Sequence, residues 1–120
     1  MTKRFTGNSS HPLTAVAVQI LLSLAKSDQH GYGIKLDVEE RTGGAMSLGS
    51  GTLYQAIQRL ERQGFIAESA AAGEHDARRG RCYRLEAAGR AALQAELRRW
   101  DEIVRYARDN AVIPDPKLRS

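Results

Sequence analysis

Residues 50–64 form the clearest amphipathic segment of this sequence. Leu53, Ile57 and Leu60 recur at the i, i+4, i+7 spacing of one buried helix face. Ser50 stands where an N-cap belongs, and Gly64 ends the helix. The opposite side carries polar and basic side chains, namely Thr52, Gln55, Gln58, Arg59 and Arg62. Such a helix packs one face on a core and leaves the other face for solvent or a partner.

Two helices are expected before this segment. The first runs from about Pro12 to Lys26 and is so apolar that it is predicted to be buried on most sides. A turn over Ser27–Gly31 leads to the second helix, from about Tyr32 to Thr42, which Gly43-Gly44 ends. The pattern predicts a helix-turn-helix step that leads into the amphipathic third helix.

Two strands, Phe65–Ala67 and Arg81–Leu85, are expected to form a β-hairpin, followed by a long helix from about Glu86 to Asn110. The predicted fold class is mainly α with a small β-hairpin. Three helices followed by a hairpin describe a winged helix-turn-helix domain. The predicted organisation is a flexible arm over 1–11, a winged helix-turn-helix DNA-binding domain over 12–85, a dimerisation helix over 86–110 and a flexible tail over 111–120.

Composition limits the remaining possibilities. A chain of 120 residues is one domain's worth of sequence, and its single cysteine, Cys82, excludes an internal disulfide. The net charge of +4 is compatible with nucleic acid but does not demonstrate binding. The most apolar stretch, Leu13–Ala25, is shorter than the about 20 residues that a membrane helix needs. A cytoplasmic protein with no membrane partner is therefore expected.

The residues that support catalysis or metal binding are not grouped in this sequence. His11, His30 and His75 are far apart and lack the spacing of metal ligands. The glycine-rich stretch Gly49-Ser50-Gly51 lacks the Gly-Lys-Ser/Thr of a phosphate-binding loop. The sequence therefore predicts no enzyme activity, no metal and no cofactor.

Three motifs resemble the PadR family of transcriptional regulators. They are His30-Gly31-Tyr32-Gly33-Ile34, the block from Gly51 to Ile66, and Arg81-Cys82-Tyr83-Arg84-Leu85 followed by Ala88-Gly89-Arg90. The short final region resembles the smaller members, which have one C-terminal helix. The resemblance implies a dimeric, ligand-responsive repressor that binds double-stranded operator DNA. In such proteins the third helix enters the major groove and the wing touches the backbone or the minor groove.

The DNA-binding residues are expected on the third helix, at the start of the second helix and on the wing. Gln and Arg can pair with base edges in the major groove, and backbone N–H groups at Ser50 and Gly51 suit a phosphate. The wing is markedly basic, and arginines at its tip can reach phosphates. The predicted set is Tyr32, Lys35, Ser50, Gly51, Thr52, Tyr54, Gln55, Gln58, Arg59, Arg78, Arg79 and Arg81.

The final helix carries apolar residues at alternating spacings of four and three, which is a heptad seam. The seam residues are Leu93, Leu97, Trp100, Val104 and Ala107. A second stripe, Ile103 and Tyr106, adjoins it, and one small domain cannot cover both stripes. A homodimer through this helix is therefore predicted. Packing of the same seam against the first helix of its own chain is the alternative, and both arrangements can hold in part.

Trp100 is a candidate for binding a ligand. The resemblance to the PadR family implies this role, because its multidrug-binding members place a tryptophan at this position, facing its symmetry mate. A planar aromatic effector could stack between the two indoles. The alternative is a tryptophan packed in the dimer core. The surrounding candidates are Leu97, Leu93, Ala17, Val18 and Leu21.

A second function class stays open at this point. The segment from residue 31 to residue 63 carries four basic and four acidic side chains, so its charge alone does not favour DNA. Gly80 and Cys82 replace the basic and aromatic residues that are usual in the family's wing strand. A winged-helix protein-interaction module without DNA binding is the alternative, and salt-dependent binding to duplex DNA separates the two.

Overall fold

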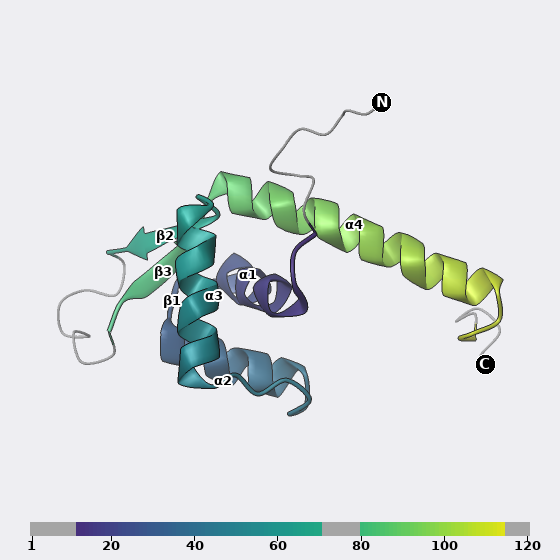
Figure 1. Ribbon diagram of the computed structural model, residues 1–120, viewed down its shortest axis with the longest axis horizontal. Helices are drawn as coiled ribbons and strands as arrows, with labels where there is room; N and C mark the ends of the chain where they lie inside the picture. The colour runs from purple at the N-terminus through teal and green to yellow at the C-terminus, as the bar shows by residue number, and fades with distance from the viewer. Residues whose placement is uncertain (1–11, 71–79, 115–120) are drawn as a thin grey trace.

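The computed structural model describes residues 12–70 and 80–114 and shows a small three-helix unit with a sheet on one side and a long protruding helix (Figure 1). Predictions for the N-terminal arm, for Arg78 and Arg79 and for residues 115–120 lie outside the described residues. The elements are α1 (Ala15–Lys26), β1 (Gln29–His30), α2 (Gly31–Arg41), α3 (Ser50–Arg62), β2 (Ile66–Ser69), β3 (Cys82–Leu85) and α4 (Ala87–Asp109).

The core lies between α1, α2 and α3. Helix α1 buries residues around most of its circumference, as its apolar sequence predicted. Helix α3 buries Leu53, Ile57 and Leu60, which confirms the face predicted from their spacing. The core continues onto Phe65, Ile66 and Tyr83 of the sheet region. The mainly helical winged-helix architecture predicted from the sequence is thus confirmed.

The sheet has three strands rather than the two predicted. Its order is β1-β3-β2, and both pairings are antiparallel. In β1, Gln29 pairs with Tyr83 and His30 pairs with Cys82. The sequence pattern predicted only a turn here, because two residues are too few to show an alternating pattern. Both hairpin strands also begin one residue later than predicted, at Ile66 instead of Phe65 and at Cys82 instead of Arg81.

Helices α1 and α3 are capped by other residues than predicted, and α2 and α4 start within one residue of the predicted positions, at Gly31 and Ala87. Pro12 does not begin α1, because Thr14 is the N-cap and its Oγ1 accepts the Ala17 N–H at 3.0 Å. The prediction of Ser50 as an N-cap is wrong, since Gly49 occupies that position and Ser50 is the first helical residue. Helix α3 consequently starts without a side-chain hydrogen bond at its cap.

Helices α1 and α2 are held together by Asp37. Its carboxylate accepts hydrogen bonds from Lys26 Nζ (2.6 Å), Ser23 Oγ (2.7 Å) and Arg41 Nη1 (2.8 Å). The bonds from Lys26 and Ser23 outweigh burial, which acts in the opposite direction, and with Arg41 they lower the pKa of Asp37 from 3.8 to about 2. The charged form of Asp37 therefore stabilises the folded state.

The Asp37 cluster predicts a specific acid sensitivity. Because the folded-state pKa is depressed, this stabilisation is present above about pH 4 and is lost as the pH falls toward 2. We expect Asp37→Asn to lower the free energy of unfolding by about 1–2 kcal/mol at neutral pH, and the gap to the parent to close at pH 2. Urea unfolding at several pH values measures this. A gap that stays constant with pH would contradict it, and Glu40→Gln, at an exposed position on the same helix, is the control.

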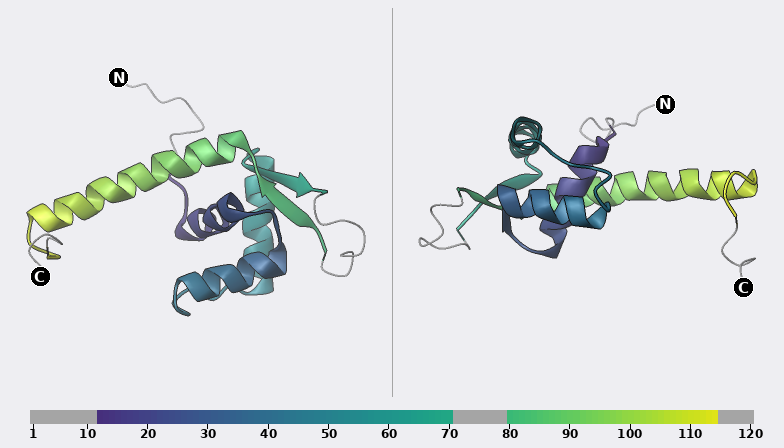
Figure 2. Two further views of the ribbon diagram at one scale, coloured as in Figure 1. Left: turned by 180° about the vertical axis from the view of Figure 1, so that it is seen from behind. Right: turned by 90° about the horizontal axis from the view of Figure 1, so that it is seen from below.

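The start of α4 packs directly on the turn before β2. The Glu86 N–H donates to the Phe65 carbonyl oxygen at 2.9 Å. A Cβ added at Gly89 would overlap that same oxygen, so only glycine permits this approach. From this anchor α4 passes α1 and continues as an isolated rod (Figures 1 and 2).

Candidate nucleic-acid interface

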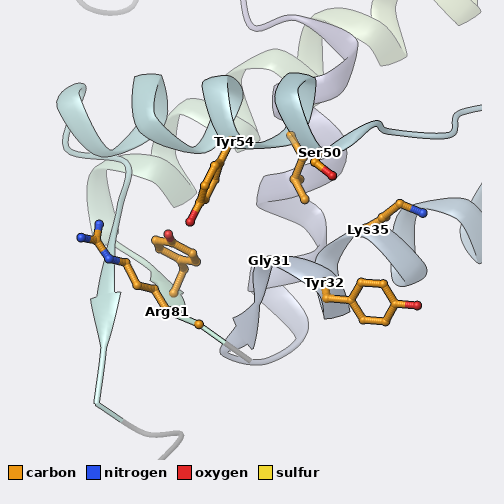
Figure 3. Close-up of a pocket in the computed structure, with 9 residues that line it drawn as sticks. Gly31, Tyr32, Lys35, Ser50, Tyr54 and Arg81 are labelled. Atoms are coloured by element: carbon orange, nitrogen blue, oxygen red, sulfur yellow. The ribbon is translucent and has the colours of Figure 1, made fainter. Parts of the chain in front are cut away.

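A pocket of about 210 Å³ lies where the start of α2, the first half of α3 and the beginning of β3, the return strand of the wing, meet (Figure 3). Five of the predicted DNA-binding residues are brought together around it, which are Tyr32, Lys35, Ser50, Tyr54 and Arg81. In Figure 3, Tyr54 points from α3 toward the wing strand, and Tyr32 and Lys35 extend from α2 on the other side of Gly31. The apolar Leu53 and Tyr83 also line the pocket.

Two helix N-termini face this pocket. Gly31, the first residue of α2, and Ser50, the first residue of α3, both line it. Their N-caps, His30 and Gly49, make no side-chain hydrogen bond to the first turn. The first N–H groups of a helix have no partner within the helix and carry its partial positive charge. The pocket is therefore chemically suited to an anion such as a phosphate.

The two cations at the pocket differ in how firmly they are engaged. Lys35 Nζ forms an ion pair with Glu39 Oε2 at 2.7 Å, and this hydrogen bond raises the pKa of Lys35. Arg81 Nε lies 3.8 Å from Glu68 Oε2, and both side chains are more than half exposed. An exposed pair at that distance contributes little to stability, so Glu68 holds Arg81 only weakly, and Arg81 also interacts with the side chain of Tyr83.

The outward face of α3 is accessible along its length. Gly51, Thr52, Gln55 and Gln58 are all exposed, on sides of the helix turned away from its buried residues. Arg59 is also exposed but lies at the flank of α3 toward α1. There it lines a second pocket of about 250 Å³ together with residues that include Pro12, Leu13, Thr14 and Ala17.

Arg62 was not among the predicted DNA-binding residues, although it is exposed on the same face of α3. It follows Gln58 by four residues, so the helical spacing alone was sufficient to include it. Arg62 is the last residue of α3, at the end of the helix opposite to Ser50, and it adds a positive charge to the outward face.

The structure places the predicted ligand-binding residues in two environments, some in the buried core and others partly exposed on α4. Val18 and Leu21 are fully buried in the core, and Ala17 and Leu93 are nearly so. Leu97 and Trp100 pack against the core but remain partly exposed. The first half of the heptad seam therefore packs within its own chain, which was the alternative interpretation. The second half differs, because Val104 is exposed, as are Ile103 and Tyr106.

A buried carboxylate that the sequence pattern did not single out lies beside Trp100. Glu96 is only 4% exposed, and it accepts hydrogen bonds from Leu13 N–H, Arg99 and the Trp100 indole. Burial by itself would raise the pKa of Glu96, but these three bonds hold the pKa below its ordinary value. Glu96 precedes Arg99 by three residues and Trp100 by four, and this helical spacing is the only local sequence signal of these contacts.

The described part of the chain offers neither a metal site nor a membrane span. Within residues 12–70 and 80–114, no three His, Cys, Asp or Glu side chains gather in a way suited to a metal ion. No helix in the same ranges combines the length and the apolar character required to cross a membrane.

Residues 20–95 match the family model described as "Transcriptional regulator PadR-like family". Among solved structures, the chain is similar to a transcriptional regulator from Clostridium thermocellum, with 26% identity and a TM-score of 0.66 over 78% of this chain and 87% of that one. A PadR family regulator from Clostridium difficile has the same identity and TM-score over 82% of this chain and 99% of that one. A probable regulator from Pseudomonas aeruginosa is 28% identical, with a TM-score of 0.57, over 82% of this chain and 66% of that one. No curated protein sequence matches the chain.

Proposed function

Because this chain belongs to the PadR-like family of transcriptional regulators, we propose that it is a homodimeric repressor that binds operator DNA in the cytoplasm. The family is one of transcription regulators and not of enzymes. The observation that carries the proposal is the pocket between α2, α3 and the wing. In this pocket, two helix N-termini without a side-chain hydrogen bond from their caps lie with the cations Lys35 and Arg81 beside an exposed face of α3.

The shape and chemistry of this surface support the proposed DNA binding. Helix α3 lies along the major groove, where Gln55 and Gln58 read base edges. The pocket takes a backbone phosphate next to the groove, held by the first N–H groups of α2 and α3. The wing, which carries Arg81 in the described region, lies against the neighbouring backbone. Phosphate contacts fix the register, and α3 supplies the sequence preference.

The outer half of α4 supports the proposed dimerisation. Ile103 and Tyr106 are 66% and 71% exposed, and Val112 is exposed just beyond the helix. Ile103 and Tyr106 are three residues apart and so neighbours on one face of the helix, and exposed apolar neighbours on a protruding helix are typical of an interface. A second copy packed there forms a two-fold dimer whose two α3 helices read two half-sites.

The proposed effector is a planar aromatic compound that binds at the dimer interface. Trp100 is the single tryptophan, and the partly exposed Leu97 lies beside it on the same face. A flat ring system gains stacking on an indole. Such a ligand releases DNA only if it binds one dimer geometry more tightly than the other.

The function test is specific binding through α3. We expect Gln55→Ala and Gln58→Ala each to reduce discrimination between the preferred site and random DNA by about 1–3 kcal/mol, because each substitution removes a bidentate bond to a base. The preferred site is first selected from a random duplex library with the parent protein, and affinities are then measured by fluorescence anisotropy. Gln94→Ala, at an exposed position of α4, is the matched control. If the parent selects no sequence and binds duplexes without salt dependence, the proposed function is wrong.

The wing is expected to supply affinity rather than sequence choice. Removing one bond to a phosphate reduces the magnitude of the slope of log K against log salt by about 0.9. Arg78→Ala, Arg79→Ala and Arg81→Ala combined should therefore reduce it by up to about 2.7 per wing, with the sequence preference unchanged. Arg98→Ala, an exposed arginine on α4, should leave the slope as it is. An unchanged slope in the triple variant would argue against phosphate binding by the wing.

A further inference from the structure

Helix α4 packs on the DNA-binding unit through apolar side chains such as Leu93, and two further contacts along its length are directional. The first is its start, where Gly89 packs on the Phe65 carbonyl and the Glu86 N–H donates to that oxygen. The second is Glu96, two helical turns or about 10 Å further along. A rod fixed at one point can pivot, whereas a rod fixed at two points has a defined direction.

The second attachment is a group of hydrogen bonds inside an apolar interface. We call Glu96 and its three donors, on Leu13, Arg99 and Trp100, the polar joint. Glu96 Oε1 accepts the Leu13 N–H at 2.9 Å, just before the Thr14 N-cap of α1. Its Oε2 accepts the Trp100 indole N–H at 2.9 Å, and Arg99 Nη2 donates to Oε1 at 2.6 Å. One carboxylate thus connects the beginning of α1 to two side chains of α4. Its negative charge also lies beside the positive end of α1, which is a favourable position.

The joint is costly to break. A buried carboxylate is tolerated only when it is paired and hydrogen-bonded, and all three donors here act on Glu96. Removing it takes away the acceptor of the Leu13 N–H and of the indole N–H, in a region where Leu13, Leu97 and Trp100 pack against the core. The neighbouring contacts of Leu97 and Trp100 are apolar and non-directional, so they permit small rotations that the hydrogen bonds of Glu96 do not.

We propose that Glu96 is a positioning residue that sets the angle between α4 and the DNA-binding unit, and thereby the spacing of DNA half-sites that the dimer accepts. The proposal rests on the proposed dimer through the outer part of α4. In that dimer, a pivot of α4 about Gly89 moves each α3 helix relative to its counterpart. The separation of the two α3 helices determines which half-site spacing fits. Glu96 therefore acts on specificity without touching DNA.

The experiment measures this separation directly, without DNA. A nitroxide is attached to Gln55→Cys on α3, while the native Cys82 is buried. Pulsed double electron–electron resonance then gives the distance distribution between the two α3 helices of the dimer. We expect Glu96→Gln, which keeps the size but removes the charge and one acceptor, to broaden the distribution by about twofold or more. Glu102→Gln, at an exposed position of the same helix, should match the parent.

Two further readouts separate a positioning role from a general loss of stability. Amide exchange at Leu13 should accelerate by about tenfold or more in Glu96→Gln, because the charge-assisted bond to its N–H is weakened. On duplexes in which the selected half-sites are moved apart stepwise, the ratio of affinities between the preferred spacing and its neighbours should fall by at least about threefold. The preference for the half-site sequence should stay unchanged. If Glu96→Gln does not unfold cooperatively, Glu96→Asp, which keeps the charge but is shorter, replaces it in all three measurements.

The outcomes are distinguishable. An unchanged distance distribution, or an equal loss of affinity at every spacing, overturns the role of Glu96. A parent that binds no DNA overturns the proposed function, while the nitroxide distances still decide whether Glu96 sets the angle. A monomeric parent, which shows no dipolar coupling between labels, overturns both the dimer and the role of Glu96.

Discussion

Gly89→Ala is expected to lower the free energy of unfolding by about 3 kcal/mol, although it adds a single methyl group. The new Cβ would overlap the Phe65 carbonyl oxygen and lie 2.9 Å from the Phe65 carbonyl carbon. Backbone atoms cannot rotate away as a flexible side chain can. The start of α4 must therefore shift, and the hydrogen bond from the Glu86 N–H to the same oxygen is strained with it. Urea unfolding followed by circular dichroism measures the loss.

The matched control for this variant is another helical glycine. A Cβ at Gly51 would have no atom within 4 Å, and Gly51 lies within α3. Gly51→Ala should therefore leave stability unchanged or raise it by up to about 1 kcal/mol, because alanine has the higher helix propensity. Equal stability of the two alanine variants would show that α4 does not pack on Phe65 as described.

Local periodicity was sufficient to predict the main helices and the core face of α3. The spacing of Leu53, Ile57 and Leu60 alone indicates that they are buried, because apolar residues recur in consecutive turns on the hydrophobic face of a helix. The third strand could not be found in this way. Gln29 and His30 form β1 only because the return strand of the wing passes beside them, and a contact of that kind leaves no local pattern.

The site was predictable to a similar degree. The predicted DNA-binding set included Tyr32, Lys35, Ser50, Tyr54 and Arg81, and the fold brings these five residues around one pocket. The sequence did not show that Arg59 lies toward α1, or that Val18 and Leu21 are buried too deeply to line the predicted ligand site. Both depend on the angle at which helices cross, which many side chains determine together. For the same reason Glu96 was missed, since its partner Leu13 is 83 residues away in the sequence.

The structure also changes which residues of α4 best test the proposed dimer. Leu97 packs partly on its own core, so an aspartate there would disturb the monomer as well as the interface. Ile103 and Tyr106 are 66% and 71% exposed, and both follow Trp100, which packs against the core. Charges at these two positions should therefore leave the monomer folded and act on association alone.

We expect Ile103→Asp and Tyr106→Asp combined to weaken dimerisation by about 100-fold or more. Each change removes an apolar side chain worth about 1.5–3 kcal/mol on burial, and a factor of 100 corresponds to about 2.8 kcal/mol. Each aspartate would also carry an unpaired charge into the interface, which adds to the loss. Sedimentation equilibrium measures the dissociation constant, and Gln94→Asp, at an exposed position on another side of α4, should leave it unchanged.

The same double variant should lose the advantage of binding two half-sites at once. Two linked half-sites bind more tightly than one because the second contact is intramolecular. A monomer should therefore bind the full selected site no more tightly than an isolated half-site, while its preference for the half-site sequence, which α3 provides, stays intact. Fluorescence anisotropy on the two duplexes tests this. A variant that remains a dimer with the parent's affinity would place the interface elsewhere. A monomer that keeps the parent's full-site affinity would show that the dimer is not needed for operator binding.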